Sequence, residues 1–347
     1  MGGKFRHMAI WFNGLPDTQS PRQIIERLKA AGIDNPFLAA DHERDKAKLQ
    51  EVIEEAHRGG LTVHGDFDEL RCREKSPDDL VQMLKDGTKK KVLCPANPAV
   101  VGYVLQRLER VLSTFNYDGI TLDDGYYFAR AGDYDPAREA GSKFKAIPCC
   151  YCSYCRSHAP IETPEWERWK LEQVTALIGK QAELARQMKP GILFSAAAHM
   201  PYDRTFYQPH RQEIPYFEGW GVSQSRSGYL ADWVEWVRRG HLDFALPMIY
   251  YHTLDLVRWQ TQECRQLLSS ASKTIWVGLG LGTVAAEYYQ GLSDQQGFKA
   301  KDPAMMNGAQ TVETKLQDQL RMGQENVAFF CYSELHDEHL PVLARYR

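Results

Sequence analysis

Residues 97–124 read NPAVVGYVLQRLERVLSTFNYDGITLDD, and this stretch decides the fold class. The segment 97–115 opens with Asn97 and Pro98 and carries apolar residues at helical spacing, so it predicts a helix. GITL at 119–122 is a short apolar run of the kind that forms a buried parallel strand. Two carboxylates, Asp123 and Asp124, follow that strand directly. A helix that leads into a buried strand is one unit of an α/β fold.

The same unit recurs along the whole chain. Eight short apolar runs alternate with amphipathic segments, which predicts a parallel sheet with right-handed crossovers. Eight is the number of strands that closes a (β/α)8 TIM barrel. The apolar runs are HMAIWF (7–12), PFLAA (36–40), LTVHG (61–65), GITL (119–122), ILFSAAA (192–198), FALPMIYY (244–251), TIWVGLG (274–280) and VAFFCYS (327–333). The amphipathic segments are 21–32, 48–60, 97–115, 164–187, 229–240 and 311–323.

An open doubly wound sheet is the alternative architecture. It would carry a glycine-rich phosphate turn after the first strand, whereas WFNGLPD follows that strand here. We therefore expect a single barrel over residues 1–347. The loops after the fourth and fifth strands (124–163 and 199–229) are long, and the active site of such a barrel lies in these loops.

The bulk composition excludes several classes of protein. The net charge is -3 and 43% of the residues are apolar, as in an ordinary globular protein. Lys89, Lys90 and Lys91 are the only basic run, and we interpret them as a solvated turn, so no nucleic-acid partner is expected. No apolar window is long enough to span a membrane, and no signal peptide is visible at the start. These features predict a cytoplasmic protein with reduced cysteines; an oligomer is possible but not indicated.

Carboxylates recur at the predicted strand ends. Successive strand residues point to opposite faces, so one of Asp123 and Asp124 should face the barrel mouth. Such a carboxylate can act as nucleophile, base or electrostatic stabiliser. Glycoside hydrolysis needs a second carboxyl group, and Asp66, Asp203 and Glu334 are the candidates.

Other polar and aromatic side chains are expected at the same mouth. Rings there could stack on sugar faces, and histidines or hydroxyls could bind sugar hydroxyl groups. The candidates for substrate binding are Trp11, Asp41, His64, Tyr126, His199, Tyr202, Tyr250 and His252. Each has a plain alternative reading as a core residue or a satisfied polar group under a loop.

Four of the 8 cysteines fall within CCYCSYC at 149–155. Cys150, Cys152 and Cys155 offer three thiols, and structural zinc takes four ligands in a tetrahedron. Cys94 precedes the helix at 97–115, and in a barrel its loop neighbours the loop of the triple, so it is the candidate fourth ligand. A disulfide or a redox dithiol is less consistent with a reducing compartment and with the absence of a thioredoxin-like unit. A catalytic zinc would need His158 in place of one thiolate.

The tract CPANPAVVGYVLQRLERVLSTFNYDGITLDD (94–124) resembles a recurrent pattern of (β/α)8 glycoside hydrolases, the hypothetical glycosyl hydrolase families of bacterial genomes. HLDFALPMIYY (241–251) is similar to the sixth-strand segment of the same group, and the resemblance extends over about residues 50–280. It implies that Asp123 is the nucleophile, with Asp124 as the alternate. Other such barrels carry an Asn-Glu pair where this chain has Asp-Asp.

The cysteines carry a second resemblance. Family 42 β-galactosidases have a Cys at the equivalent C-P-x-x-P segment and a C-x-C-x-x-C triple, which bind a structural zinc. The resemblance implies Zn²⁺ on Cys94, Cys150, Cys152 and Cys155, pinning a loop insertion at 130–163.

These observations predict a glycoside hydrolase that cleaves a carbohydrate substrate with a carboxylate pair at the barrel mouth. Two alternatives from other classes stay open. One is a non-catalytic carbohydrate-binding barrel, and the other is a zinc-dependent hydrolase of a different bond type.

Overall fold

The computed structural model describes residues 3–40, 46–72, 80–123, 150–158, 160–161, 163–198, 230–250, 254–268, 275–281 and 308–347. Its main sheet has eight parallel strands in the order β8-β7-β6-β3-β2-β1-β10-β9. Isolated bridges from Ala245 to Ile275 and from Met248 to Gly278 connect β8 to the segment of β9, so the sheet nearly closes on itself. The predicted (β/α)8 barrel is confirmed. The strands are β1 (His7–Trp11), β2 (Asn35–Ala39), β3 (His64–Phe67), β6 (Gly119–Leu122), β7 (Leu193–Ala198), β8 (Phe244–Pro247), β9 (Val277–Gly280) and β10 (Asn326–Phe330).

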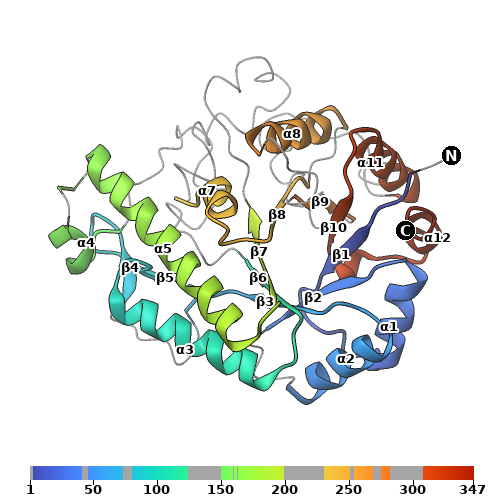
Figure 1. Ribbon diagram of the computed structural model, residues 1–347, viewed down its shortest axis with the longest axis horizontal. Coiled ribbons are helices and arrows are strands. Elements are labelled where there is room, and N and C mark those ends of the chain that lie inside the picture. The colour runs from blue at the N-terminus through green and yellow to red at the C-terminus, as the bar shows by residue number, and fades with distance from the viewer. Residues whose placement is uncertain are drawn as a thin grey trace.

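Helices surround the strands on the outside (Figure 1). Their starts follow from local sequence: the Ser20 hydroxyl caps α1 together with Gln23, and the Asn97 side chain accepts the Ala99 N–H at 3.0 Å to cap α3. None of the described helices is long and apolar enough to cross a membrane. The helices are α1 (Pro21–Ala30), α2 (Lys46–Arg58), α3 (Pro98–Thr114), α4 (Ser153–His158), α5 (Pro164–Met188), α7 (Trp233–Arg238), α8 (Leu254–Leu267), α11 (Ala309–Arg321) and α12 (His339–Arg345), with the 3-10 turn η6 (Tyr332–Glu334) after β10.

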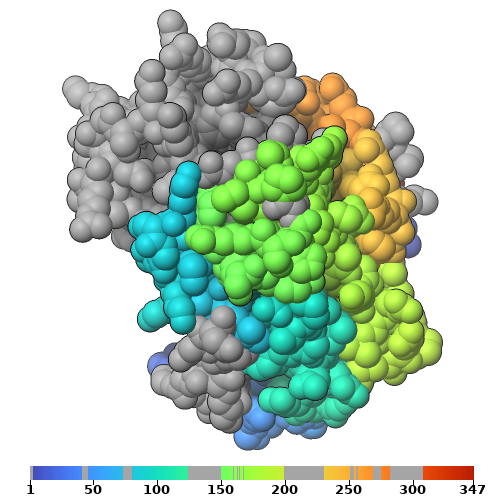
Figure 2. Space-filling model, turned by 90° about the vertical axis from the view of Figure 1, so that its left-hand side faces the viewer, coloured from blue at the N-terminus to red at the C-terminus, as the bar shows by residue number. Residues whose placement is uncertain are grey.

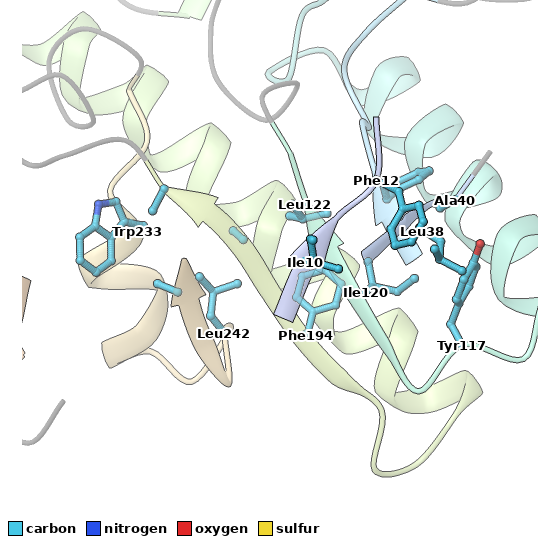
Figure 3. Close-up of a cluster of buried hydrophobic side chains, with 14 of the residues drawn as sticks. Ile10, Phe12, Leu38, Ala40, Tyr117, Ile120, Leu122, Phe194, Trp233 and Leu242 are labelled. Atoms are coloured by element: carbon cyan, nitrogen blue, oxygen red, sulfur yellow. The ribbon is translucent and has the colours of Figure 1, made fainter. Parts of the chain in front are cut away.

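Each strand divides its side chains between two cores. One residue of every pair, such as Ile10, Ile120 or Phe194, packs outward against the helices (Figure 3). The alternate residue, such as Trp11 or Phe37, packs in the barrel lumen. This alternation is the period-2 pattern of a strand that is buried on both faces. The position of a polar residue in this alternation therefore shows whether its side chain faces the lumen or the helices.

Two local differences from the expected elements matter for the site. The third strand was expected at 61–65 but runs from His64 to Phe67, so His64 begins the strand instead of ending it. The prediction of a solvated turn at Lys89–Lys91 was wrong, because these lysines lie in β5 (Lys89–Leu93), which pairs antiparallel with β4 (Val81–Met83). The β5 lysines alternate between exposed and half-buried positions, which explains their polarity. Residues 124–149 and 199–229, in the predicted long loops, lie outside the described residues.

Candidate active site and metal centre

Asp66 and Asp123 lie at the carboxyl ends of two adjacent strands. Asp66 pairs in register with Thr121 of β6, and Asp123 follows two residues later, where its N–H donates to the Phe67 carbonyl at 3.4 Å. Both side chains face the lumen, because side chains alternate along a strand and the adjacent residues Phe67 and Leu122 pack in the outer core. Strand spacing and rise place their Cα atoms about 8 Å apart. Both are half-buried, so the two carboxyl groups share one side of the barrel mouth.

The opposite side of the mouth is aromatic. Trp11 ends β1, and its ring centroid lies 6.5 Å from those of both Tyr250 and Phe330. The rings of Tyr250 and Phe330 stack at 5.1 Å. Trp11 is buried, and its indole Nε1 has no hydrogen-bond partner among the described residues. A donor without an acceptor at the mouth is suited to a polar ligand.

Glu334 lies in η6, just beyond β10, and is half-buried. Its carboxylate is 3.9 Å from His336 Nε2. Because β10 lies on the far side of β1 and β2 from β3, Glu334 belongs to the aromatic side of the mouth and not to the Asp66–Asp123 side.

His64 lies at the other end of the lumen. It pairs in register with Phe37 and with Gly119, the first residue of β6, and its Nε2 contacts Asn35 Oδ1 at 3.2 Å. It is fully buried, and burial lowers its pKa to about 4. The structure thus brings His64 into the packed floor of the barrel, away from the mouth where we expected it.

The remaining predicted site residues are not part of the described structure. They are Asp41, Asp124, Tyr126, His199, Tyr202, Asp203 and His252.

Glu69, in the turn after β3, is a buried acidic residue that the sequence did not single out. It follows β3 by two residues and is 0% exposed. Neither of its carboxyl oxygens has a hydrogen-bond partner among the described residues. Burial raises its pKa well above the usual range, the charges of Asp68 and Asp123 raise it further, and that of Arg107 lowers it. In the sequence HGDFDEL the only available signal was a third acidic residue close behind a strand.

The four predicted cysteines form one cluster. The Sγ atoms of Cys94, Cys150, Cys152 and Cys155 all lie within 4.8 Å of one another, and all four residues are buried. The Cys94 sulfur is 3.5 Å from that of Cys155 and 3.8 Å from that of Cys152. A tetrahedral zinc site with Zn–S bonds of about 2.3 Å requires S···S separations of about 3.8 Å. The donor set and its spacing therefore fit a zinc ion.

Main-chain donors point at the cluster. The N–H groups of Met83 and Cys152 donate to Cys150 Sγ at 3.2 and 3.4 Å. Such N–H···S bonds favour thiolates and orient metal ligands. Hydrogen bonds with the other three thiols, that with Cys150 foremost, raise the pKa of Cys94 well above its usual range. The neighbouring thiols thus oppose the ionisation of Cys94, and a bound cation would remove that opposition.

The cluster ties the β4–β5 hairpin to the segment after residue 149. The Tyr151 N–H donates to the Met83 carbonyl at 2.7 Å, and Cys94 follows β5 directly. Figure 2 shows the hairpin beside this segment, on the face where α3 and α5 lie side by side. Main-chain bonds from Leu93 to Leu70 and from Cys72 to Lys91 attach the hairpin to the chain that leaves β3. The cysteine cluster and the carboxylate end of β3 are therefore parts of one connected substructure.

Comparisons with solved structures agree with this architecture. The glycoside hydrolase domain of PgaB (BpsB) from Bordetella bronchiseptica superposes with a TM-score of 0.62 at 13% identity, over 98% of each chain. A β-galactosidase from the psychrophilic Marinomonas ef1 superposes with a TM-score of 0.62 at 10% identity, over 98% of this chain and 58% of that one. At such identities the likeness concerns the fold.

Sequence comparisons narrow the relationship. The glycosyl hydrolase DigH of Escherichia coli (strain K12) is 23% identical over 226 residues, 58% of this chain and 46% of DigH. The chain thus spans about half the length of the curated relatives that it matches. A family model described as "Glycosyl hydrolase-like 10" matches residues 36–296, about three quarters of the chain. With the barrel and its acidic mouth, this match shows that the chain belongs to the glycosyl hydrolase-like 10 family.

Proposed function

We propose that the protein hydrolyses a glycosidic bond at the mouth of its barrel. The observation that carries the proposal is the pairing of Asp66 and Asp123 on the lumen face of adjacent strand ends, in a member of a glycosyl hydrolase-like family. Carboxyl ends of barrel strands are where this fold places its chemistry. Asp123 is the carboxylate that attacks or stabilises the anomeric carbon.

The distance between the backbones is compatible with a carboxylate pair. Glycosidases separate their two carboxyl groups by about 5–5.5 Å for retention and about 6.5–9.5 Å for inversion. Side chains on Cα atoms about 8 Å apart can meet either requirement. Asp66, on the adjacent strand, and Glu334, on the aromatic side, are the described candidates for contacts with the sugar or for the proton donor.

The aromatic side provides a binding wall. Trp11, Tyr250 and Phe330 present three rings opposite the two aspartates, together with an indole N–H that donates to none of the described residues. Ring faces bind the apolar faces of sugars, and the N–H group binds a hydroxyl. A carbohydrate held between this wall and the carboxylates is the substrate that the mouth fits.

The proposal extends to the metal. Cys94, Cys150, Cys152 and Cys155 hold a zinc ion with four thiolates, which leaves no open position for water, so the metal is structural. It fastens the hairpin beside the mouth and pins the insertion at 130–163. A cluster of reduced thiols also fits a cytoplasmic location.

Activity on a panel of glycosides tests the function. The panel contains nitrophenyl glycosides, including β-galactosides, and oligosaccharides of the chitin type, because structural neighbours include β-galactosidases and a chitinase. We expect release of sugar by the wild type and release that is about 10²–10⁴-fold slower by Asp123→Asn. Tight binding of oligosaccharides without any release would instead support a non-catalytic carbohydrate-binding barrel.

Metal analysis tests the zinc centre. We expect one zinc per chain, lost in Cys94→Ser and kept in Cys264→Ser, a buried thiol outside the cluster. Removal of the metal should lower the melting temperature but leave turnover in the protein that stays folded. Loss of turnover in metal-free protein with an intact fold would support a zinc-dependent hydrolase instead.

A further inference from the structure

A buried thiol on the aromatic side of the mouth contacts two polar side chains that the proposed reaction does not yet use. Cys331 directly follows β10 and is buried in the lumen core together with Trp11. Its Sγ lies 3.2 Å from Nδ2 of Asn13, which is just beyond the end of β1, and 3.2 Å from Oγ of Ser333 in η6. The thiol therefore joins the segments that leave two adjacent strands at the carboxyl end of the barrel.

The contacts of Cys331 determine which hydrogen-bonding atoms remain available. The Asn13 amide turns its Nδ2 towards the sulfur, so its Oδ1 stays an acceptor with no donor among the described residues. Burial raises the pKa of the Cys331 thiol, so the thiol keeps its proton at neutral pH. An amide nitrogen cannot accept this proton, so the S–H group donates to Ser333 Oγ. The hydroxyl hydrogen of Ser333 is then available to another acceptor.

The two polar side chains are exposed, whereas the thiol that contacts both of them is closed to solvent. Asn13 and Ser333 are exposed, and Cys331 is 0% exposed. Trp11, on the same side of the mouth, is buried, and its indole N–H has no acceptor among the described residues. Buried N–H groups are nearly always paired, so this donor indicates a polar ligand beside the same strand ends.

We propose that Asn13 and Ser333 bind hydroxyl groups of an uncharged sugar on the aromatic side of the mouth, with Cys331 as the positioning residue that holds both. This inference rests on the proposed function in taking a carbohydrate as the ligand. A sugar hydroxyl both donates and accepts hydrogen bonds, so it matches an amide oxygen beside a serine hydroxyl. In ligand sites lined by rings, a few fixed polar groups of this kind determine orientation and specificity.

Binding of two probes, lactose and chitotriose, tests the recognition by calorimetry. The host is the Asp123→Asn protein, so that hydrolysis does not consume the probe. Asn13→Ala and Ser333→Ala should each weaken binding about three- to tenfold, which is the loss of one neutral hydrogen bond. Asn116→Ala changes an exposed asparagine at the opposite end of the barrel, before β6, and as the matched control it should leave the affinity unchanged.

A double-mutant cycle separates positioning from packing. Cys331→Ala alone should weaken binding by about three- to tenfold, and by a smaller factor in the Asn13→Ala background, because the two changes remove one shared contact. Cys331→Ser keeps an atom that accepts from Asn13 and donates to Ser333, so its affinity should stay within about threefold of the host protein. Cys264→Ala removes a buried thiol of α8 and should leave the affinity unchanged.

A second measurement needs no ligand. The side-chain amide protons of Asn13 should shift in Cys331→Ala protein, because their sulfur acceptor is gone, and should keep their positions in Cys264→Ala protein. NMR spectra of protein with labelled asparagine record both. If Cys331→Ala does not fold, a shift in Cys331→Ser, where oxygen replaces sulfur as the acceptor, gives the same test.

The outcomes distinguish this inference from the proposed function. Full activity of Asp123→Asn defeats the assignment of Asp123, and the KM values of the Asn13 and Cys331 variants then decide the role of these residues. Unchanged affinity in both Asn13→Ala and Ser333→Ala overturns the recognition. Additive effects of Asn13→Ala and Cys331→Ala, or amide protons that do not shift, overturn the positioning. Weaker binding with a non-additive cycle and shifted amide protons supports both.

Discussion

Strand β6 carries an aspartate at each end, and the two have different surroundings. Asp118 precedes the strand, and its Oδ2 accepts the Val63 N–H at 2.8 Å and contacts His57 Nε2 at 2.9 Å. Asp123 follows the strand and faces the lumen at the mouth. One carboxylate ties the backbone just before β3 to α2, and the other faces the barrel lumen. Residue type alone therefore does not distinguish them; the end of the barrel does.

The two ends of the lumen differ in the same way. At the floor, His64, Phe244, Trp276 and His7 form a chain of ring contacts, with Phe244 stacked on Trp276 at 4.3 Å. At the mouth, Tyr250 and Phe330 are only half-buried. The closed floor contributes stability, whereas the two half-buried rings at the mouth keep part of their surface exposed.

The largest expected effect comes from replacing the aspartate at either end of β6 by asparagine and comparing the two variants. Asp123→Asn should lower kcat by about 10²–10⁴-fold with little change in melting temperature. Asp118→Asn should do the reverse, costing about 1–3 kcal/mol of unfolding free energy because it weakens hydrogen bonds to a charged group, with kcat preserved. Steady-state kinetics and denaturant titration of both variants measure this. Slow turnover in Asp118→Asn would contradict the purely structural role of Asp118.

The floor should respond to pH through His64. Burial lowers the pKa of His64 from 6.5 to about 4, so the unfolded state binds the proton more readily. The neutral His64 contributes fully to the free energy of unfolding above pH 6.5. About 3 kcal/mol of this contribution is lost as pH falls toward 4. Denaturant titrations at several pH values should show this loss for wild type and not for His64→Gln. Equal acid sensitivity of the two proteins would show that the floor is not closed around a neutral imidazole.

Packing at the floor predicts a smaller cost. A Cβ at Gly119 would overlap the His64 ring, whereas a Cβ at Gly102 on α3 meets nothing within 4 Å. Gly119→Ala should destabilise by about 1–3 kcal/mol, and Gly102→Ala should stabilise by about 1 kcal/mol through helix propensity. Thermal unfolding compares them. An unchanged melting temperature for Gly119→Ala would mean that the His64 ring can move to accommodate the added methyl group.

The smallest effect is expected at the aromatic wall. Tyr250→Ala removes a ring that stacks on Phe330, and KM for an oligosaccharide should rise by no more than about tenfold. Tyr250→Phe keeps the ring and should bind nearly as well as wild type. If both variants weaken binding equally, the hydroxyl group and not the ring face contacts the sugar.

The barrel could be predicted because its signal is repeated. GITL has no charged residue and is buried on both faces, and the structure has β6 at the predicted residues. HGDF contains polar residues that face the lumen. The prediction followed the apolar residues before it and therefore placed the third strand too early in the chain. The β4–β5 hairpin was missed because the lysines of β5 resemble a solvated turn.

The site could be predicted only where spacing carries information. The cysteine triple has the spacing of a metal site, and the structure places its sulfurs around Cys94. His64 and Asp66 are two residues apart, and only the strand boundary shows that one belongs to the floor and the other to the mouth. Glu69 could not be identified, because the burial of a carboxyl group depends on the hairpin and on α3, which come later in the chain.

The pairing of β1 with β10 has a consequence for the timing of biosynthesis. His7 pairs with Asn326, so one edge of β1 has no partner until synthesis has passed residue 326. At about 5–20 residues per second, this interval is on the order of half a minute. During that time Met8–Trp11 presents an apolar unpaired edge, the kind that joins other chains. The yield of folded protein should therefore depend on the speed and temperature of expression.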